Sequence, residues 1–256
     1  MSSIDRYAYS NRLRTVDPAQ KIGLALSVVA LCLTLDRPAV GLLAVGWMWW
    51  LATRRAGLPA GLFGALLLAE AFFLLLAGLG IALTVGTTAS RGDGRLWDFG
   101  PFYAGFTRTS LETAARAVTR AMGAMAATNL LALTTPLVDL LDALRRWRVP
   151  VLLIELMNLV YRFVFTLLDR LTQMRIAQES RLGYVSWRRG MASAAILTSQ
   201  LLVNSYDRSR RLQIALDSRG YSGSLRVLPA GYRTDRGLVW LTALVAATLL
   251  AARVLV

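Results

Sequence analysis

Hydrophobic residues in this chain fall into long blocks that are nearly free of charge, and these blocks predict helices. They cover residues 17–35, 38–52, 58–85 and 237–255, and a further, more charged span is predicted from Thr107 to about Leu133. The longer blocks meet the roughly 20 residues that a helix needs to cross a hydrocarbon core. Because lipid offers no partner for unpaired backbone groups, the pattern favours helices in a membrane. The predicted fold class is therefore all-α, a polytopic helical membrane protein with about five transmembrane helices.

Turn residues separate the predicted helices. Asp17-Pro18 is typical of a helix start, with Asp as the N-cap and Pro in the first helical position. Residues 87–106 are rich in Gly and aromatic residues, and they predict an external loop. The predicted organisation is four transmembrane helices in residues 1–134, an amphipathic region in residues 135–236, and a last transmembrane helix in residues 237–256.

The region 135–236 predicts three helices of a different kind. A short helix begins at Pro136, and its apolar residues lie on one face. A second helix runs from Pro150 to about Leu182, and we expect Gly183 to end it. A third runs from about Ser186 to Arg219, and we expect Gly220 to end it in the left-handed conformation. The last two helices each extend over roughly 45 to 50 Å, and we expect them to begin at the membrane and project into the cytoplasm.

The charge of the chain supports this topology. The formal net charge is +14, and 28 of the 29 basic residues are Arg. Residues 136–237 hold 16 Arg against eight acidic residues, so the positive-inside rule places this segment in the cytoplasm. The same rule places the N-terminus inside, and the loop at 87–106 and the C-terminus outside. No cleavable signal peptide is expected, because the first 17 residues lack an apolar core.

Several kinds of chemistry are excluded by composition. The chain has no His and a single Cys, Cys32, so His-dependent catalysis is excluded and transition-metal ligation is disfavoured. It has no G-x-x-x-x-G-K-[ST] motif for binding ATP phosphates. Its arginines are not accompanied by a motif that reads nucleic acid. We therefore expect no catalytic residue, no metal site, no cofactor and no nucleic-acid partner.

Charged residues within apolar helices are functional candidates, because burying a charge in the membrane is costly. We expect them to contact a neighbouring helix or a partner subunit, and transport of a proton or ion is the alternative. The candidates are Glu70, Glu112, Arg116, Arg120, Glu155 and Arg162.

The two long helices end in similar sequences. The second ends in "AQESRLGY", residues 177–184, and the third in "ALDSRGYSG", residues 215–223. Each end has an acid, Ser and Arg, and the two arginines lie 38 residues apart. Together with "TPLVDLLDALRRWRVP" at 135–150 and "LMNLVYRFVFTLLDRLTQM" at 156–174, this region resembles the transmembrane T component of energy-coupling factor (ECF) transporters. The similarity is to the cobalt/nickel branch, the CbiQ type, and it covers residues 135–223, whereas the spans fit by number and placement.

The resemblance implies a scaffold subunit of an importer in a bacterial-type inner membrane. In that family, long coupling helices dock on two ATPase subunits, here CbiO-like. Each helix ends in a short motif, typically Ala-Arg-Ser or Ala-Arg-Gly, whose arginine meets acidic groups on the ATPase. The residues carried over are Glu179, Ser180 and Arg181 at the first end and Asp217, Ser218, Arg219 and Gly220 at the second. Ser180 and Ser218 stand where Ala is usual, and Leu182 follows the first Arg.

The substrate implied by the resemblance is Co²⁺ or Ni²⁺. A separate S component in the membrane, CbiM-like with or without a CbiN-like subunit, would bind it. A T component for another micronutrient such as a vitamin is an alternative. So is an integral membrane enzyme whose Arg-rich segment binds a phosphorylated substrate. A conventional ABC permease is disfavoured, because no E-A-A…G loop is found.

Overall fold

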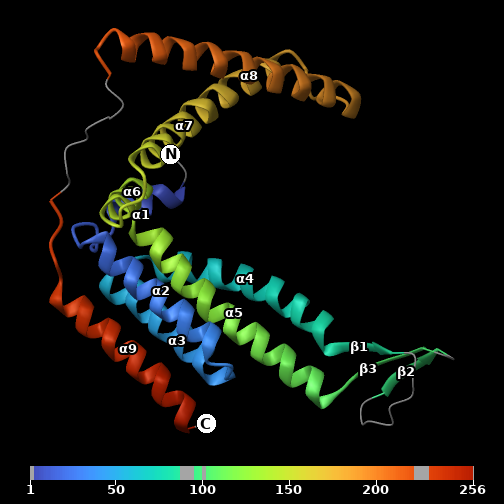
Figure 1. The fold of residues 1–256 in the computed structure, drawn as a ribbon. Coiled ribbons are helices and arrows are strands. Elements are labelled where there is room, and N and C mark those ends of the chain that lie inside the picture. Colours follow the sequence, from blue (N-terminus) through green and yellow to red (C-terminus); the bar gives the residue numbers. More distant parts are fainter. Residues whose placement is uncertain (1–2, 87–94, 100–101, 222–230, 256) are drawn as a thin grey trace. The chain divides into compact units, whose positions relative to one another are not determined.

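The computed structural model describes residues 3–86, 95–99, 102–221 and 231–255. The chain divides into two units, which we call the bundle, residues 2–140 and 231–256, and the arm, residues 141–230. Figure 1 shows that helices dominate both units. The predicted fold class, an all-α membrane protein, is confirmed.

The bundle is built around one long helix, α5. Helices α2, α3 and α4 pack against α5, and α9 packs against α2 and α3 (Figure 1). As predicted, α2 begins at Pro18, and the backbone N–H of Ala19 donates a 3.0 Å hydrogen bond to Asp17. The helices are α1 (Ser3–Ser10), α2 (Pro18–Thr34), α3 (Pro38–Trp50), which continues into the π-helical turn η1 (Leu51–Arg55), α4 (Ala60–Ala82), α5 (Arg108–Thr134) and α9 (Arg236–Leu255).

Glycines allow α3 and α5 to approach closely. A Cβ on Gly41 would collide with the backbone carbonyl of Thr119, and a Cβ on Gly123 would lie 3.1 Å from the Cα of Gly41. Helices in membranes associate largely through such small residues, because lipid supplies no hydrophobic drive between them. The crossing of α3 and α5 is therefore specified by this pair of glycines.

Polar side chains gather at one end of the bundle. The ammonium of Lys21, only 5% exposed, donates hydrogen bonds to the carbonyls of Leu13 (2.9 Å) and Thr134 (3.1 Å). Arg55 forms a 3.1 Å ion pair with Asp235, just before α9. Segments that the positive-inside rule assigns to the cytoplasm thus meet at a single end of the bundle.

Strands flank the segment predicted to be a loop. β1 (Leu83–Gly86), β2 (Arg95–Phe99) and β3 (Phe102–Phe106) form an antiparallel sheet in the order β1-β3-β2. The interpretation of 95–106 as loop was therefore wrong in its secondary structure, and residues 87–94 and 100–101 lie outside the described residues. Aromatic residues make up five of the ten residues of β2 and β3, and they favour strands. α4 correspondingly ends at Ala82, before the predicted limit at Val85.

Within the described residues, three helices are long and apolar enough to cross a membrane: α4, α7 and α9. The sharply bent pair α5 and α6 meets the same criterion together, and α2, with 17 residues, is a shorter apolar helix. The chain is thus a multi-pass membrane protein. α7 was assigned by sequence to the cytoplasmic region, and most of its exposed large hydrophobic residues lie in its first half.

The arm contains the two longest helices of the described chain, α7 and α8. They follow the break in the helical path at Thr135-Pro136. α6 (Leu137–Arg146) begins in the bundle, and α7 (Val151–Ser180) and α8 (Trp187–Asp217) follow in the arm. With 30 and 31 residues, α7 and α8 are each about 45 Å long. Residues 181–186 connect the two helices and form what we call the elbow.

Candidate functional site

The ends of α7 and α8 repeat one sequence and one local structure. The sequence Ile-Ala-X-acid-Ser-Arg occupies residues 176–181 and 214–219. The hydroxyl of Ser180 donates to the carbonyl of Ile176 (2.9 Å), and that of Ser218 donates to the carbonyl of Ile214 (2.8 Å). The two serines, which replace the expected Ala, therefore bond in the same way to their own helices.

The backbone closes both helices with the same pair of hydrogen bonds. At the first end, the N–H of Gly183 donates to Gln178 (2.9 Å) and that of Leu182 to Glu179 (3.0 Å). At the second, the N–H of Tyr221 donates to Leu216 and that of Gly220 to Asp217, both at 3.1 Å. This is the Schellman arrangement, in which one residue takes a positive φ. Arg181 and Arg219 directly precede that residue, so they occupy equivalent positions.

The residue with positive φ differs between the two ends. Gly220 has φ of 67°, as expected, but at the first end Leu182 has φ of 57° and Gly183 does not take a positive φ. As expected, α7 ends just before Gly183, whose backbone N–H closes the turn, but the residue of positive φ there is Leu182. Gly183 is needed for space, because a Cβ there would lie 2.8 Å from the Ser193 hydroxyl and 2.9 Å from the Gln178 carbonyl.

The acidic residue at each end bonds to its own helix and leaves the arginine available. Arg175 forms a 2.8 Å ion pair with Glu179, and Gln213 donates a 3.0 Å hydrogen bond to Asp217, both from four residues earlier. Arg181 and Arg219 are exposed. Their guanidinium groups form no hydrogen bond or ion pair with the described residues.

Side chains that the sequence did not single out hold the elbow. Gln178 donates to the carbonyl of Ser193 (3.0 Å) and accepts from the hydroxyl of Tyr184 (2.7 Å). The hydroxyl of Ser193 donates to the carbonyl of Gly183 (2.9 Å). These bonds fix the residues around Arg181. In the sequence, the only indication that Gln178 holds the elbow was its position in the repeated motif.

The second end is tied to α7. The hydroxyl of Tyr221 donates a 2.9 Å hydrogen bond to Glu155, which is only 8% exposed. The bond to this carboxylate raises the pKa of Tyr221 above its ordinary value, and burial and the charge of Glu155 act in the same direction. Glu155, a candidate subunit contact, thus has a partner within its own chain.

Most of the charged candidates in the bundle form either hydrogen bonds to a neighbouring helix or ion pairs. Asn129 on α5 donates hydrogen bonds to both carboxylate oxygens of Glu70 on α4, at 2.8 and 3.0 Å. Glu112 pairs with Arg108 (3.3 Å) and Arg116 (3.7 Å).

Arg116 also reaches Asp36 in the turn between α2 and α3, at 3.7 Å. Arg120, one turn further along α5, forms no ion pair with any described residue. The predicted stripe of Glu112, Arg116 and Arg120 therefore lies on one helix, but its members do not form one network. Arg162 lies in the arm, on α7 with Glu155, and the two side chains line one small pocket. In the part of the chain that the structure describes, no three Cys, Asp or Glu side chains converge as metal ligands.

Fold and site together define a multi-pass membrane protein whose arm presents two equivalent arginines that form no ion pair with the described residues. A family model described as "Cobalt transport protein", CbiQ, matches residues 10–229. The chain belongs to this CbiQ family, the type of T component that its sequence resembles.

Individual relatives agree with this assignment. The chain is 35% identical over 243 residues to the cobalt transport protein CbiQ of Rhodobacter capsulatus, and the match covers 93% of each chain. It is 29% identical over 245 residues to the cobalt transport protein CbiQ of Salmonella typhimurium, covering 89% of this chain and all of that one. It is 31% identical over 225 residues to a putative fused cobalt transport protein CbiMQ of Methanocorpusculum labreanum. That match covers 87% of this chain, which spans 37% of the length of the fused protein.

Proposed function

We propose that this chain is the non-catalytic coupling subunit of an ECF-type importer. In this proposal, two CbiO-like ATPase subunits bind the ends of α7 and α8, and a separate S component binds the transported Co²⁺ or Ni²⁺. The chain itself neither hydrolyses ATP nor holds the metal. The N-terminus and the arm lie on the cytoplasmic side of a bacterial-type inner membrane, and the C-terminus lies outside.

The observation that carries this proposal is the equivalence of Arg181 and Arg219. Both follow a Ser that bonds to an Ile carbonyl, both precede a residue of positive φ, and both are exposed. A lone arginine at a helix C-terminus stabilises the helix dipole by only about 0.3 to 1 kcal/mol, a role that requires no repeated motif. A planar guanidinium can instead bind a carboxylate bidentately. Two such groups support two contacts of the same kind with acidic sites on a partner.

The relatives support the choice of cargo and of a membrane partner. Three proteins that match 87–93% of this chain are named as cobalt transport proteins. One of these names describes a fusion, CbiMQ, which supports a CbiM-like S component beside this chain, with or without a CbiN-like subunit. A vitamin or another micronutrient is the alternative cargo, and uptake assays with Co²⁺, Ni²⁺ and vitamins would distinguish them.

The test is charge reversal at both ends, Arg181→Glu with Arg219→Glu. Breaking a buried, hydrogen-bonded charge pair typically costs roughly 2 to 5 kcal/mol. At about 1.4 kcal/mol per factor of ten, we expect each end to bind its ATPase at least ten-fold more weakly. Metal uptake and copurification of the ATPase should both fall, and each single variant should lose less than the double variant.

The matched control reverses two other exposed arginines of α8, Arg188→Glu with Arg210→Glu. It makes the same change in net charge, and we expect it to retain the ATPase. If the double variant at the helix ends inserts normally, keeps its ATPase and transports at the wild-type rate, the coupling role is wrong. The proposed orientation is tested separately by Ser209→Cys in a Cys32→Ala background. Labelling of this cysteine from outside intact cells would contradict a cytoplasmic arm.

A further inference from the structure

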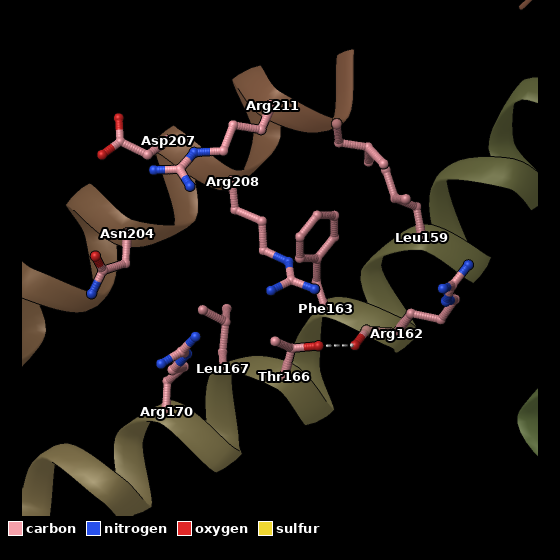
Figure 2. A pocket seen from close by; sticks show the side chains of 11 residues that line it. Leu159, Arg162, Phe163, Thr166, Leu167, Arg170, Asn204, Asp207, Arg208 and Arg211 are labelled. Atoms are coloured by element: carbon pink, nitrogen blue, oxygen red, sulfur yellow. Dashed lines mark hydrogen bonds between the residues drawn. The ribbon is translucent and has the colours of Figure 1, made fainter. Parts of the chain in front are cut away.

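A groove with a volume of about 600 Å³ lies between the middle of α7 and the second half of α8. Figure 2 shows side chains from both helices around this space. Four arginines line it, Arg162 and Arg170 from α7 and Arg208 and Arg211 from α8, with Asp207 as the single carboxylate. The lining therefore carries a net charge of +3, and all four arginines are exposed.

The charge of this groove is not neutralised within the described chain. None of the four arginines forms an ion pair with a described residue, and Arg208 instead lies over the ring of Phe163, 5.6 Å from its centroid. Figure 2 shows the Arg170 and Arg208 side chains directed into the space between the two helices. Guanidinium groups that converge without forming an ion pair favour binding of an anion, and phosphate accepts their hydrogen bonds well.

The floor of the groove is apolar and continues toward the start of α7. Leu159 and Phe163 line the groove and are half-buried. Leu152 and Leu156 precede Leu159 by seven and three residues, so the three leucines share one helical face. Leu152 is 64% exposed and Leu156 48% exposed. An apolar strip about 10 Å long thus leads along α7 into the arginine cluster.

The position of the groove along α7 matches a membrane surface. α7 meets the criterion of length and hydropathy for a membrane span. Its first arginine is Arg162, eleven residues after Val151, and every arginine of α7 lies from there onward. The groove therefore begins where the helix changes from apolar to basic, which is the level of lipid headgroups for a helix that leaves the hydrocarbon core. Basic pockets on the cytoplasmic side are suited to anionic lipid headgroups.

We propose that this groove binds an anionic phospholipid, with the phosphate between Arg170 and Arg208 and the acyl chains along Leu152, Leu156 and Leu159. The amphiphilic lining favours a lipid over a free phosphate, which would leave the apolar strip exposed. The site is separate from Arg181 and Arg219, and it requires no ATPase and no S component.

The test uses the purified full chain in mild detergent. Native mass spectrometry compares retention of phosphatidylglycerol with retention of phosphatidylcholine that carries the same acyl chains. We expect phosphatidylglycerol to bind about ten-fold more tightly. Arg170→Gln with Arg208→Gln should weaken its binding by on the order of 10- to 30-fold, since each basic residue near a headgroup contributes about a factor of five.

The matched control is Arg188→Gln with Arg189→Gln, which removes the same charge from α8 outside the groove and should change the affinity less than two-fold. Circular dichroism and size-exclusion chromatography establish that each variant is folded. Leu152→Gln with Leu156→Gln tests the apolar strip. It should weaken binding of long-chain phosphatidylglycerol but not of the short-chain dihexanoyl form.

Four results would overturn the proposal. Equal retention of both lipids would remove the anion preference, and an equal effect of the control variant would reduce it to overall charge. Inorganic phosphate that competes as strongly as the long-chain lipid would make the ligand a free phosphate. A poly-glutamate peptide that binds tightly and depends on Arg170 and Arg208 would indicate an acidic protein instead. These measurements use the chain alone, without an ATPase. A negative result would therefore overturn lipid binding but not the coupling role, which the Arg181→Glu and Arg219→Glu variants test separately.

Discussion

The hydroxyl of Tyr221 donates a 2.9 Å hydrogen bond to the carboxylate of Glu155. This bond ties the residues that follow Arg219 to the first part of α7, while Gln178 and Ser193 hold the elbow near Arg181. α7 and α8 are therefore joined near both ends of α8. The two helix ends are held by different side chains, although their backbone structure is the same.

Tyr221 should ionise at a higher pH than an ordinary tyrosine, whose pKa is 10.0. Its pKa is raised, so the bond to Glu155 stabilises the fold below pH 10 and is lost as the pH rises through the raised native value. We expect the difference in absorbance at 295 nm between wild type and Tyr221→Phe to show a transition above pH 10. A transition at or below pH 10 would contradict the bond.

The two residues of positive φ should respond in opposite ways to substitution. A side chain in the left-handed conformation costs roughly 1 to 2 kcal/mol, whereas Gly adds about 0.5 to 1 kcal/mol of unfolded-state entropy. Leu182→Gly should therefore stabilise its turn by up to about 1 kcal/mol, and Gly220→Leu should destabilise the other. Hydrogen exchange of the amides at 182–183 and 220–221 measures the two turns separately.

Gly190→Ala is the control for this pair, because its Cβ would lie 3.7 Å from Tyr184, an ordinary contact. It should leave both turns unchanged. If Leu182→Gly speeds exchange at the elbow as Gly220→Leu does at the second end, the φ values do not determine the stability of these turns.

The sequence predicted the parts of this site that depend on residues close together in the chain, and it missed those that depend on distant residues. The acid-Ser-Arg repeat lies within a few residues, so it correctly indicated two equivalent helix ends. The helix end near Gly183 was predicted, but the positive φ of Leu182 was not, and the closeness of Ser193 to Gly183 is visible only in the folded elbow. The bond from Tyr221 to Glu155 spans 66 residues, and no local pattern announces it.

Asn129 should stabilise the bundle through Glu70. Asn129→Leu would leave the half-buried carboxylate without its amide donor. A fully buried unsatisfied group costs about 1 to 3 kcal/mol, so we expect a loss toward the lower end of that range. Replacing both residues with Leu should restore much of the stability, because no polar group then remains unpaired. A double-mutant cycle from thermal unfolding in detergent should give a coupling of about 0.6 to 1.7 kcal/mol. Additive effects of the two single changes would show that the pair is not coupled.

Gly41→Val should prevent the close packing of α3 and α5. The new side chain would meet the backbone of Thr119, which cannot move without displacing α5. We expect the variant to fail to accumulate as folded protein, measured by monodisperse yield in size-exclusion chromatography. Gly46→Val is the matched control in the same helix, because a Cβ at Gly46 meets nothing within 4 Å. Equal yields of the two variants would contradict a specific role for Gly41.

The bundle shows a similar division between local and distant information. Block lengths and Pro residues predicted the start of α2 at Pro18 and placed α5 and α9 within a few residues. The burial of Lys21 was not predicted, because a basic residue near a chain end is usually solvated. Its partners are carbonyls of Leu13 and of Thr134, 113 residues away. The sheet β1-β3-β2 was missed because hydropathy gave little weight to short aromatic strands.

The repeat of one motif at the ends of α7 and α8 has a consequence for symmetry. Arg181 and Arg219 stand in the same local structure, so a receptor that recognises one end has the chemistry to recognise the other. One chain thus presents the same motif twice, at the ends of two successive helices. Under the proposed function, one asymmetric polypeptide would therefore bind two identical subunits, with the end of α7 on one copy and the end of α8 on the other.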